Sequence, residues 1–315
     1  MPRSMARSRF KGALCAGLTA SAFLALVPAA HADDFALTLD GKGLKNQVAS
    51  IAGTVNVNGK LSNPGGPGVP VTVTVTVGKD QVIKRQILTQ TQGNFSMPIF
   101  VNRCCQYRIS ATATPPAGPV TKTAAFNVGG IPQLHPGSTG PKTKLFISSL
   151  RDQGYFVRGK DRFTSSTQIA ILAFRKVNHL NRNESYSRGI FRTLLEGKGA
   201  FPLAHPEEGK HVEADLSRQV LVLADNGRPK YTFPISSGAS ATPTVTGKFH
   251  FYLKTPGYNA KRMYYSAYFI GGYATHGYSP VPNYPASHGC LRNPIADSVF
   301  IYNWINIGDT IYVYH

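Results

Sequence analysis

The chain has 315 residues, and its 34 Lys and Arg against 15 Asp and Glu give a formal net charge of +19 at pH 7. This length allows two or three compact domains, each with its own core. The charge indicates a polyanionic neighbourhood, but the chain has no recognition helix, RNP-type aromatic strand or zinc-finger spacing. We therefore exclude nucleic acid as its partner.

The first 32 residues have the pattern of a secretory signal peptide. Four basic residues within the first eleven positions precede an apolar run over residues 13–30, and Ala30-His31-Ala32 forms a small-x-small cleavage site. The alternative, a membrane anchor, is disfavoured because acidic residues follow the run, and no other stretch reaches the ~20 apolar residues of a span. We expect a secreted protein without a stable membrane anchor. Removal of the segment takes away four positive charges and lowers the net charge from +19 to +15. This positive charge is explained by contact with anionic wall polymers, by contact with a membrane surface, or by solubility alone.

Three cysteines remain after this cleavage, Cys104, Cys105 and Cys290. A secreted disulfide scaffold has a denser and usually even set. The adjacent pair allows a vicinal disulfide or two buried thiols, and we favour buried thiols because bridge geometry disfavours neighbours. Cys290 has no evident partner, and an unpaired thiol in an oxidising compartment indicates a chemical role.

Residues 33–131 consist of short β runs separated by Gly, Pro and Asn turns. In residues 69–77 Val alternates with Thr after Pro70, the period of a half-buried strand, and residues 107–114 and 122–128 are further strands. This spacing predicts an antiparallel sandwich of immunoglobulin-like kind. It contains no catalytic constellation, so we expect a spacer, stalk or adhesive module.

Residues 132–141 have the Pro, Gly and Ser content of a linker, and helical patterns follow in residues 142–197. The first helix should carry Leu145 and Leu150 on one face and end near Gly154. Ser165-Ser166-Thr167 offers an N-cap for the second, and residues 189–195 form the third.

This helical region resembles the small three-helix peptidoglycan-binding domain. The resemblance rests on Leu150, Gly154-Tyr155, Gly159, Phe163, Thr167, Ala170, Phe174 and Leu180. It departs from that family at Arg175, where Gln is common, and in its weaker second half; an unrelated helical domain is the alternative. The resemblance implies glycan binding, which nothing in the helices alone reveals.

Residues 209–315 return to strand patterns. Residues 219–223 form a nearly continuous apolar strand, Asn226-Gly227 is a strong hairpin signal, and residues 230–235 pair back. Further strands are expected at residues 248–253, 268–275 and 310–314. The whole chain is therefore predicted to be multidomain and mainly β.

The informative segment of this region is Ala274-Thr275-His276-Gly277, followed after a loop by Ser287-His288-Gly289-Cys290-Leu291-Arg292. A cysteine nucleophile needs a base within hydrogen-bond reach and donors for an oxyanion. His276 ends a strand, and the 14 residues before Cys290 allow the loop to fold back beside it. Gly289 leaves backbone N–H groups free to face a substrate.

We also expect the Cys290 thiolate to be favoured by its surroundings. Asn293-Pro294 has the pattern of N-cap and N1 of a helix that runs towards Trp304, and Arg292 adds a full positive charge. Both a helix N-terminus and a cation lower the pKa of a thiol, which is ~8.5 when free.

Three other interpretations of these residues stay open. Cys290 can be an inert thiol, although its loop is polar and inert cysteines lie in apolar surroundings. His276, His288 and Cys290 can be zinc ligands, although no fourth ligand or HExxH motif is evident. His288 can be structural, holding the loop by hydrogen bonds.

The two segments resemble the signature of the L,D-transpeptidase (YkuD-type) catalytic domain. Further matches are residues 217–223, 236–238, 242–243, 247–249, 263–265 and 281–285. The chain has Leu291 after the cysteine where that family often has Ile or Val. The resemblance implies a β-rich fold that needs no metal or organic cofactor.

The resemblance also implies a reaction. Cys290 would attack the L,D amide of a donor tetrapeptide stem of peptidoglycan, with His276 as base, oriented by a backbone carbonyl near Gly277. A second stem would resolve the acyl-enzyme as acceptor and give a 3→3 cross-link. The amides of Gly289 and Cys290 would stabilise the oxyanion, while His288 and Arg292 would shape the site or bind the donor carboxylate.

Three other functions compete with this interpretation. An L,D-carboxypeptidase would use water as acceptor on the same acyl-enzyme. A non-catalytic wall-binding protein is disfavoured by the intact His276 and Cys290. A papain-like protease is disfavoured because the histidine precedes the cysteine. The sequence leaves the acceptor, the crossbridge chemistry and the oligomeric state undecided.

Overall fold

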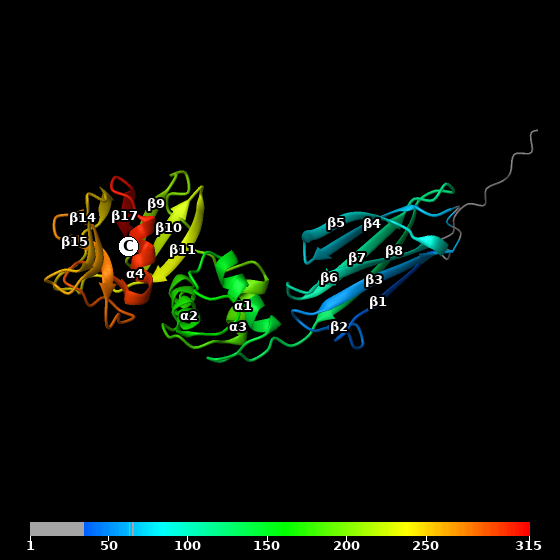
Figure 1. The fold of residues 1–315 in the computed structure, drawn as a ribbon, viewed down its shortest axis with the longest axis horizontal. Coiled ribbons are helices and arrows are strands. Elements are labelled where there is room, and N and C mark those ends of the chain that lie inside the picture. Colours follow the sequence, from blue (N-terminus) through cyan, green and yellow to red (C-terminus); the bar gives the residue numbers. More distant parts are fainter. Residues whose placement is uncertain (1–34, 63, 65) are drawn as a thin grey trace, which may run out of the picture.

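The computed structural model describes residues 35–62, 64 and 66–315, so the predicted signal peptide lies outside the described residues. Three parts follow one another along the long axis of the molecule: strands, then helices, then a second β-rich part (Figure 1). None of the described helices is long and apolar enough to cross a membrane.

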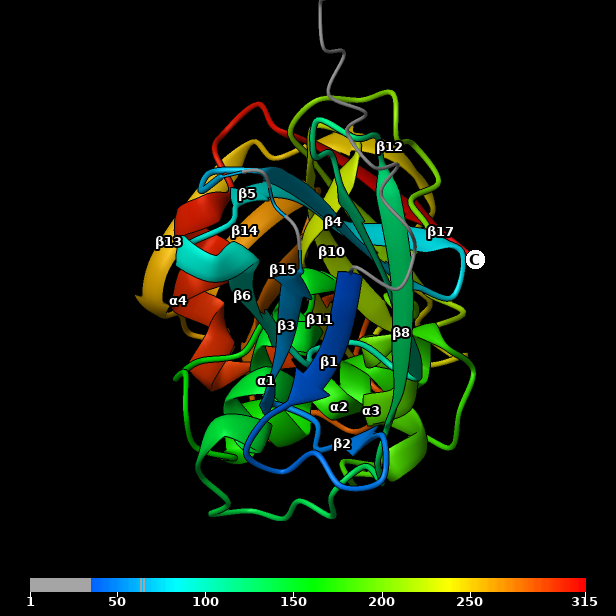
Figure 2. The ribbon, with the colours of Figure 1, turned by 90° about the vertical axis from the view of Figure 1, so that its right-hand side faces the viewer.

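The N-terminal part consists of two sheets. One has the order β1 (Phe35–Asp40), β3 (Thr54–Leu61), β6 (Asn94–Phe100), and the other β2 (Val48–Ala49), β8 (Val120–Val128), β7 (Gln106–Ala113), β4 (Pro70–Val77), β5 (Asp80–Leu88). A 3₁₀ turn, η2 (Thr91–Gly93), precedes β6. The valines of β4 are buried and its threonines half-buried, as the alternation predicted. Figure 2 shows the two layers from their free end. The immunoglobulin-like assignment stays a prediction.

The two adjacent cysteines differ from the expectation. Cys104 and Cys105 form a disulfide in the turn between β6 and β7, so the prediction of two buried thiols is wrong. Cys104 is half-buried and Cys105 is exposed. The turn lies at the end of the strands, where Cys104 packs only against the edge of the apolar core and Cys105 faces solvent.

The middle part contains α1 (Pro141–Asp152), α2 (Ser165–Val177) and α3 (Arg188–Leu195). The first and third helices match the expected positions. The N-cap of α2 is Thr164, one residue before the expected serines, and its N–H donates to Thr167 Oγ1 at 3.2 Å. The Phe146 ring packs edge-on against Phe191 at 5.1 Å between centroids, which joins α1 to α3.

The helices are packed tightly against the C-terminal part. Phe156, after α1, contacts the rings of Phe233 and Phe300 at 5.0 and 4.4 Å between centroids. The buried Lys176 of α2 donates through Nζ to the carbonyl oxygens of Gln219 (3.2 Å) and Ile235 (2.8 Å). A lysine side chain buried on carbonyls of another part indicates that the two parts form one folded body.

The C-terminal part has two sheets and one helix. The first sheet has the order β11 (Arg228–Pro234), β10 (Val220–Asp225), β9 (His211–Asp215), β17 (Thr310–Tyr314), β12 (Gly247–His250). The second has the order β13 (Leu253–Tyr258), β14 (Tyr264–Ile270), β15 (Tyr273–Tyr278), β16 (Leu291–Pro294), and α4 is Ile295–Trp304. Side chains such as Phe233, Phe251 and Leu291 fill one core in this part. Asn226-Gly227 forms the predicted hairpin between β10 and β11.

Three local predictions for this part are wrong. Residues 248–253 cross from one sheet to the other: Phe251 N–H donates to Asp309 O, but Tyr252 N–H donates to Tyr268 O, both at 3.0 Å. Residues 268–275 are a hairpin that turns at Gly271, whose φ is +48°. Residues 291–294 are a strand, and the helix begins only at Ile295, because pairing with β15 takes up this backbone.

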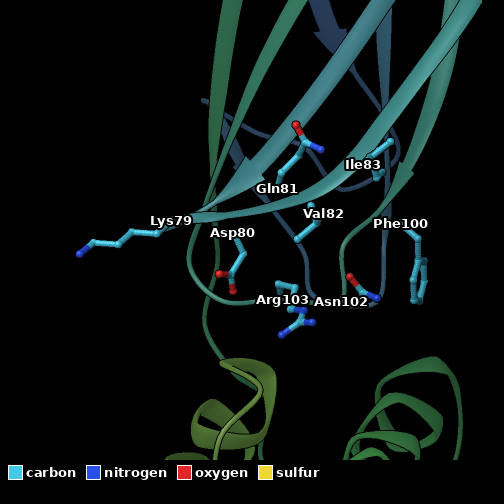
Figure 3. Close-up of a pocket in the computed structure, with 8 residues that line it drawn as sticks. All are labelled: Lys79, Asp80, Gln81, Val82, Ile83, Phe100, Asn102 and Arg103. Atoms are coloured by element: carbon cyan, nitrogen blue, oxygen red, sulfur yellow. The ribbon is translucent and has the colours of Figure 1, made fainter.

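A polar cavity of 770 Å³ lies where the N-terminal strands meet the helices. It is lined by Lys79, Asp80, Gln81, Val82, Ile83, Phe100, Asn102 and Arg103. Figure 3 shows Asp80 and Arg103 directed towards the helices and Lys79 extending sideways, out of the cavity. All the residues that line it belong to the N-terminal part, and it is on the far side of the helices from β15 and β16 (Figure 1).

The buried Asp297 in α4 is expected to limit stability near neutral pH. Its carboxylate oxygens have no hydrogen-bond partner among the described residues, and the partly exposed Arg158 approaches at 3.5 Å. Burial raises its pKa from 3.8 to about 6, an effect that the Arg158 charge opposes. Since the folded pKa exceeds the unfolded one, the contribution of Asp297 to stability is most favourable below pH 3.8 and becomes less favourable as the pH rises through about 6.

We predict that Asp297→Asn raises the free energy of unfolding above pH 6 by on the order of 2 kcal/mol, because Asn has no charge to desolvate. The difference in stability between the variant and wild type should shrink between pH 6 and pH 4 and vanish below pH 4. Thermal unfolding of both proteins across this range checks the prediction. A variant less stable than wild type at pH 7.5 would show that the Arg158 ion pair outweighs the burial of the charge.

Candidate active site

The predicted base and nucleophile come from neighbouring strands. Strands β15 and β16 pair in parallel, with Thr275 opposite Leu291 and His276 opposite Arg292. Cys290 directly precedes β16, so it lies beside the chain at Ala274. The loop between the two strands thus brings Cys290 back to the strand that carries His276, although 14 residues separate them.

The His276 side chain is held in one orientation. Its Nδ1 lies 2.9 Å from the carbonyl oxygen of Gly277, and only 3% of the residue is exposed. A carbonyl can only accept, so Nδ1 carries the hydrogen and Nε2 is left as the basic nitrogen. Burial lowers the pKa of His276 to about 4; the Gly277 contact opposes this and the Arg292 charge adds to it. The imidazole is therefore neutral at pH 7.

A buried polar network supports His276 from behind. A Cβ at Gly277 would overlap Ser298 Oγ, so glycine is required for α4 to approach β15. Ser298 Oγ donates to Asn293 Oδ1 at 2.7 Å, and Asn293 Nδ2 donates to Thr275 Oγ1 at 3.1 Å. Sequence reasoning missed Ser298 and placed Asn293 at a helix cap; only the pairing of β15 with β16 brings these residues together.

The environment of Cys290 differs from the expectation of a stabilised thiolate. The half-buried thiol donates to the carbonyl oxygen of Gly272 at 3.6 Å. Burial raises its pKa, opposed by a backbone hydrogen bond with Ala274 and by the charges of Arg292 and Lys261. Residues 291–294 after the thiol form a strand, and α4 begins at Ile295, one residue later than expected. At rest the Cys290 thiol and the His276 imidazole are thus both neutral.

The nucleophile loop is closed by Ser287. Its Oγ donates to the carbonyl oxygen of Cys290 at 2.5 Å and accepts the Gly289 N–H at 3.1 Å. Gly289 has φ +109°, and a Cβ there would collide with the Tyr273 ring. The Gly289 amide is therefore engaged and not free for an oxyanion, contrary to the expectation. Among the residues described, no acceptor pairs with the Cys290 N–H.

Arg292 and His288 have different surroundings. The Arg292 guanidinium lies over the Tyr278 ring at 4.1 Å and donates to the carbonyl oxygen of Ala286 at 3.1 Å. Its backbone N–H and C=O both pair with Ser236 at 2.9 Å, which anchors the loop. His288 is exposed. No group of potential metal ligands within the described part of the chain includes His276, His288 or Cys290.

A groove of 270 Å³ lies between the helices and the end of β15. It is lined by Ile169, Leu172, Lys176, Glu184, Pro234, Tyr278, Ser279, Val281, Pro282, Pro294, Ile295 and Ala296. Tyr278 separates this groove from His276, whose ring it meets edge-on at 5.9 Å between centroids. The helical part thus contributes to the surface next to the site.

Comparison with known proteins identifies the family. The model of the L,D-transpeptidase (YkuD-type) catalytic domain matches residues 209–313. The crystal structure of an L,D-transpeptidase from Xylanimonas cellulosilytica is 32% identical with a TM-score of 0.52, and the match covers 98% of that chain and 59% of this one. The chain belongs to the L,D-transpeptidase family. Because 59% exceeds the share of residues 209–313, this match also includes residues outside the family domain.

Other solved L,D-transpeptidases are more distant. The structure from Stackebrandtia nassauensis is 19% identical, with a TM-score of 0.37, 59% of this chain and 97% of that chain covered. The structure from Mycobacterium tuberculosis is 13% identical with a TM-score of 0.32, and the match covers 89% of this chain and 98% of that one. No curated protein matches the chain.

The neutral pair of Cys290 and His276 predicts the pH dependence of Cys290 alkylation. Because burial raises the thiol pKa above its ordinary 9.0, the rate with iodoacetamide should keep rising up to at least pH 9. Because the pKa of His276 is about 4, no thiolate–imidazolium pair should give a plateau between pH 5 and 8. Stopped-flow alkylation across pH 4–10 measures this, with Cys290→Ala as the control for other groups. A rate that is flat from pH 5 to 8 would contradict the neutral pair.

The two histidines should differ in their contribution to acylation of Cys290. We expect His276→Ala to slow acylation by a carbapenem-type β-lactam ~10²–10⁴-fold, as loss of a general base does. His288→Ala should lose less, because its side chain is exposed and acts only through the loop. Mass spectrometry of the adduct over time gives both rates. A larger defect in His288→Ala would reverse the assignment.

Proposed function

We propose that this protein is an exported peptidoglycan L,D-transpeptidase that forms 3→3 cross-links through a cysteine acyl-enzyme at Cys290. One observation carries the proposal: His276, with Nδ1 held on Gly277 O and Nε2 free, lies on the strand that pairs with the segment leading from Cys290. Family membership adds the reaction class and peptidoglycan stem peptides as substrates.

The proposed reaction begins with the neutral pair. His276 Nε2 takes the thiol proton as Sγ attacks the carbonyl carbon between the third stem residue and the terminal D-alanine. The tetrahedral oxyanion collapses, the C–N bond breaks, and His276 returns the proton to the leaving amine. The side-chain amine of a second stem then attacks the thioester, with His276 taking the amine proton, and Cys290 is released as the thiol.

The low pKa of His276 fits this role. A base with a pKa of about 4 is unprotonated throughout the neutral range, so it is always ready to accept the thiol proton. The Gly277 carbonyl then stabilises the imidazolium that forms transiently, because it accepts from Nδ1–H in both states. Thiolate is generated only during attack, which limits oxidation of an otherwise unpaired cysteine.

Export, wall location and wall binding are parts of the same proposal. The signal-peptide pattern of residues 1–32 supports secretion to the cell wall. The resemblance of residues 142–197 to a peptidoglycan-binding domain supports glycan contact, and the N-terminal strands then act as a spacer. We propose peptidoglycan as the only partner, without metal or organic cofactor.

Cys290→Ala should abolish turnover while thermal unfolding stays unchanged, because the thiol contributes chemistry on a loop. Incubation of the mature protein with purified tetrapeptide muropeptides should give dimers that lack one D-alanine. Mass spectrometry separates these dimers from tripeptide monomers, which would indicate L,D-carboxypeptidase activity instead. Wild-type protein without either product, or Cys290→Ala with full activity, would refute the cysteine-enzyme proposal.

Wall binding should depend little on salt if the helical part binds glycan. We expect the full-length mature protein to sediment with insoluble peptidoglycan at both 0.05 and 0.5 M NaCl. The Debye length falls from roughly 14 Å to roughly 4 Å between these conditions, so a purely electrostatic contact weakens strongly. Binding that disappears at the higher salt would assign it to the basic surface. Cys290→Ala serves as a control that excludes covalent capture.

A further inference from the structure

Thr244 makes a hydrogen bond that defines the direction of the Cys290 N–H. Its Oγ1 donates to the carbonyl oxygen of Gly289 at 2.8 Å, and the residue is 5% exposed. The peptide bond between Gly289 and Cys290 is trans, as it is not among the cis bonds of the chain. In a trans peptide the C=O and N–H point in opposite directions. A carbonyl tied to Thr244 therefore turns the Cys290 N–H away from Thr244.

Thr244 is itself fixed by the segment that precedes it. Its Oγ1 accepts the Gly238 N–H at 2.9 Å, so the hydroxyl hydrogen is committed to Gly289 O. Gly238 pairs with Ser287, and Thr242 Oγ1 donates to the carbonyl oxygen of Ser287 at 3.0 Å. A Cβ at Gly238 would overlap the backbone of residues 242–244. The segment 238–244 is thus a rigid support for the nucleophile loop.

The other amide next to the nucleophile is not free. Gly289 N–H donates to Ser287 Oγ, whereas the Cys290 N–H has no acceptor among the residues described. The Cys290 N–H is therefore the backbone donor next to Sγ that is left for an oxyanion. The direction of the Cys290 N–H depends on the Gly289 carbonyl in the same peptide. The Thr244 hydroxyl, which holds this carbonyl, therefore determines where the N–H points.

We propose that Thr244 is a positioning residue that aims the Cys290 N–H at the oxyanion formed during acylation. This inference rests on the proposed function of Cys290 as an acylated nucleophile. Thr244 does not touch the substrate: as Sγ bonds to the carbonyl carbon, the carbonyl π electrons move to oxygen, and that oxygen accepts the Cys290 N–H. Preorganised donors of this kind lower the barrier because they need no reorganisation during the reaction.

The reaction rates of Cys290 with two electrophiles distinguish a role in oxyanion stabilisation from a purely structural role of Thr244 in the loop. A carbapenem-type β-lactam reacts through a tetrahedral oxyanion, whereas iodoacetamide loses iodide from its CH₂ carbon as the C–S bond forms and gives no oxyanion. Thr244→Val removes the hydroxyl at nearly constant volume. We expect it to slow β-lactam acylation at least about tenfold, towards the ~10²-fold that loss of an oxyanion-hole donor costs. Alkylation by iodoacetamide should change less than about twofold, and the concentration for half-maximal acylation rate should stay the same.

Matched variants complete the experiment. Thr244→Ser keeps the hydroxyl and should restore most of the acylation rate, and Thr244→Ala serves if the valine variant does not fold. Thr232→Val is the control, because Thr232 is a buried threonine of β11 whose hydroxyl has no hydrogen-bond partner in the described structure. It should leave both reactions unchanged.

The outcomes are distinct from those of the proposed function. If Thr244→Val reacts with the β-lactam like wild type, or slows both electrophiles equally, Thr244 does not position an oxyanion donor. If wild-type Cys290 forms no β-lactam adduct at all, the cysteine acyl-enzyme itself is refuted. Selective loss of acylation in Thr244→Val and Thr244→Ala, with recovery in Thr244→Ser, is the result that the proposal requires.

Discussion

The parallel pairing of β15 with β16 is the constraint on which the candidate site depends. Because His276 lies opposite Arg292, the chain entering β16 places Cys290 beside the strand that carries the base. The same pairing brings Asn293 next to Thr275 and allows Ser298 of α4 to reach Asn293. The register of these two strands therefore also positions the hydrogen-bond network behind His276. A shift of this register by one residue would turn the side chains of β16 to the opposite face and separate the two reactive groups.

Burial then determines the electrostatics of the pair. Desolvation raises the pKa of Cys290 and lowers that of His276, so both effects favour the neutral forms. Arg292 lowers both pKa values but is itself engaged with Tyr278 and Ala286. In the proposed reaction, such a site stores no thiolate and relies on proton transfer during attack. Hydrogen-bond donors aimed at the developing oxyanion therefore matter more here than a preformed ion pair, which is why the orientation of the Gly289–Cys290 peptide is important.

The helical part belongs physically to the C-terminal part. Lys176 is buried on carbonyls of Gln219 and Ile235, and Phe156 packs between β11 and α4. The match with the Xylanimonas cellulosilytica enzyme likewise extends beyond residues 209–313. Its helices thus line a groove next to Tyr278, and any glycan that they bind would lie close to the strand of the base. The N-terminal strands also share an apolar core cluster with the helices, and the polar cavity lies at this end of the strands (Figure 3).

The sequence by itself determined the strands with strict alternation, the Asn226-Gly227 hairpin, two of the helices and the family of the catalytic part, because these depend on local periodicity and on short motifs. It indicated His276 and Cys290 as candidates for the same reason. The turn inside residues 268–275 also left a local signal, the two-residue hairpin sequence Gly271-Gly272, which the sequence analysis overlooked. Only the tertiary structure decided that residues 248–253 cross between two sheets, since no break interrupts their apolar pattern. It also decided that residues 291–294 extend a sheet instead of starting a helix, and that Thr244 holds the Gly289 carbonyl. These features depend on strand pairing between residues far apart in the chain, and pairing partners leave no signal in the local sequence.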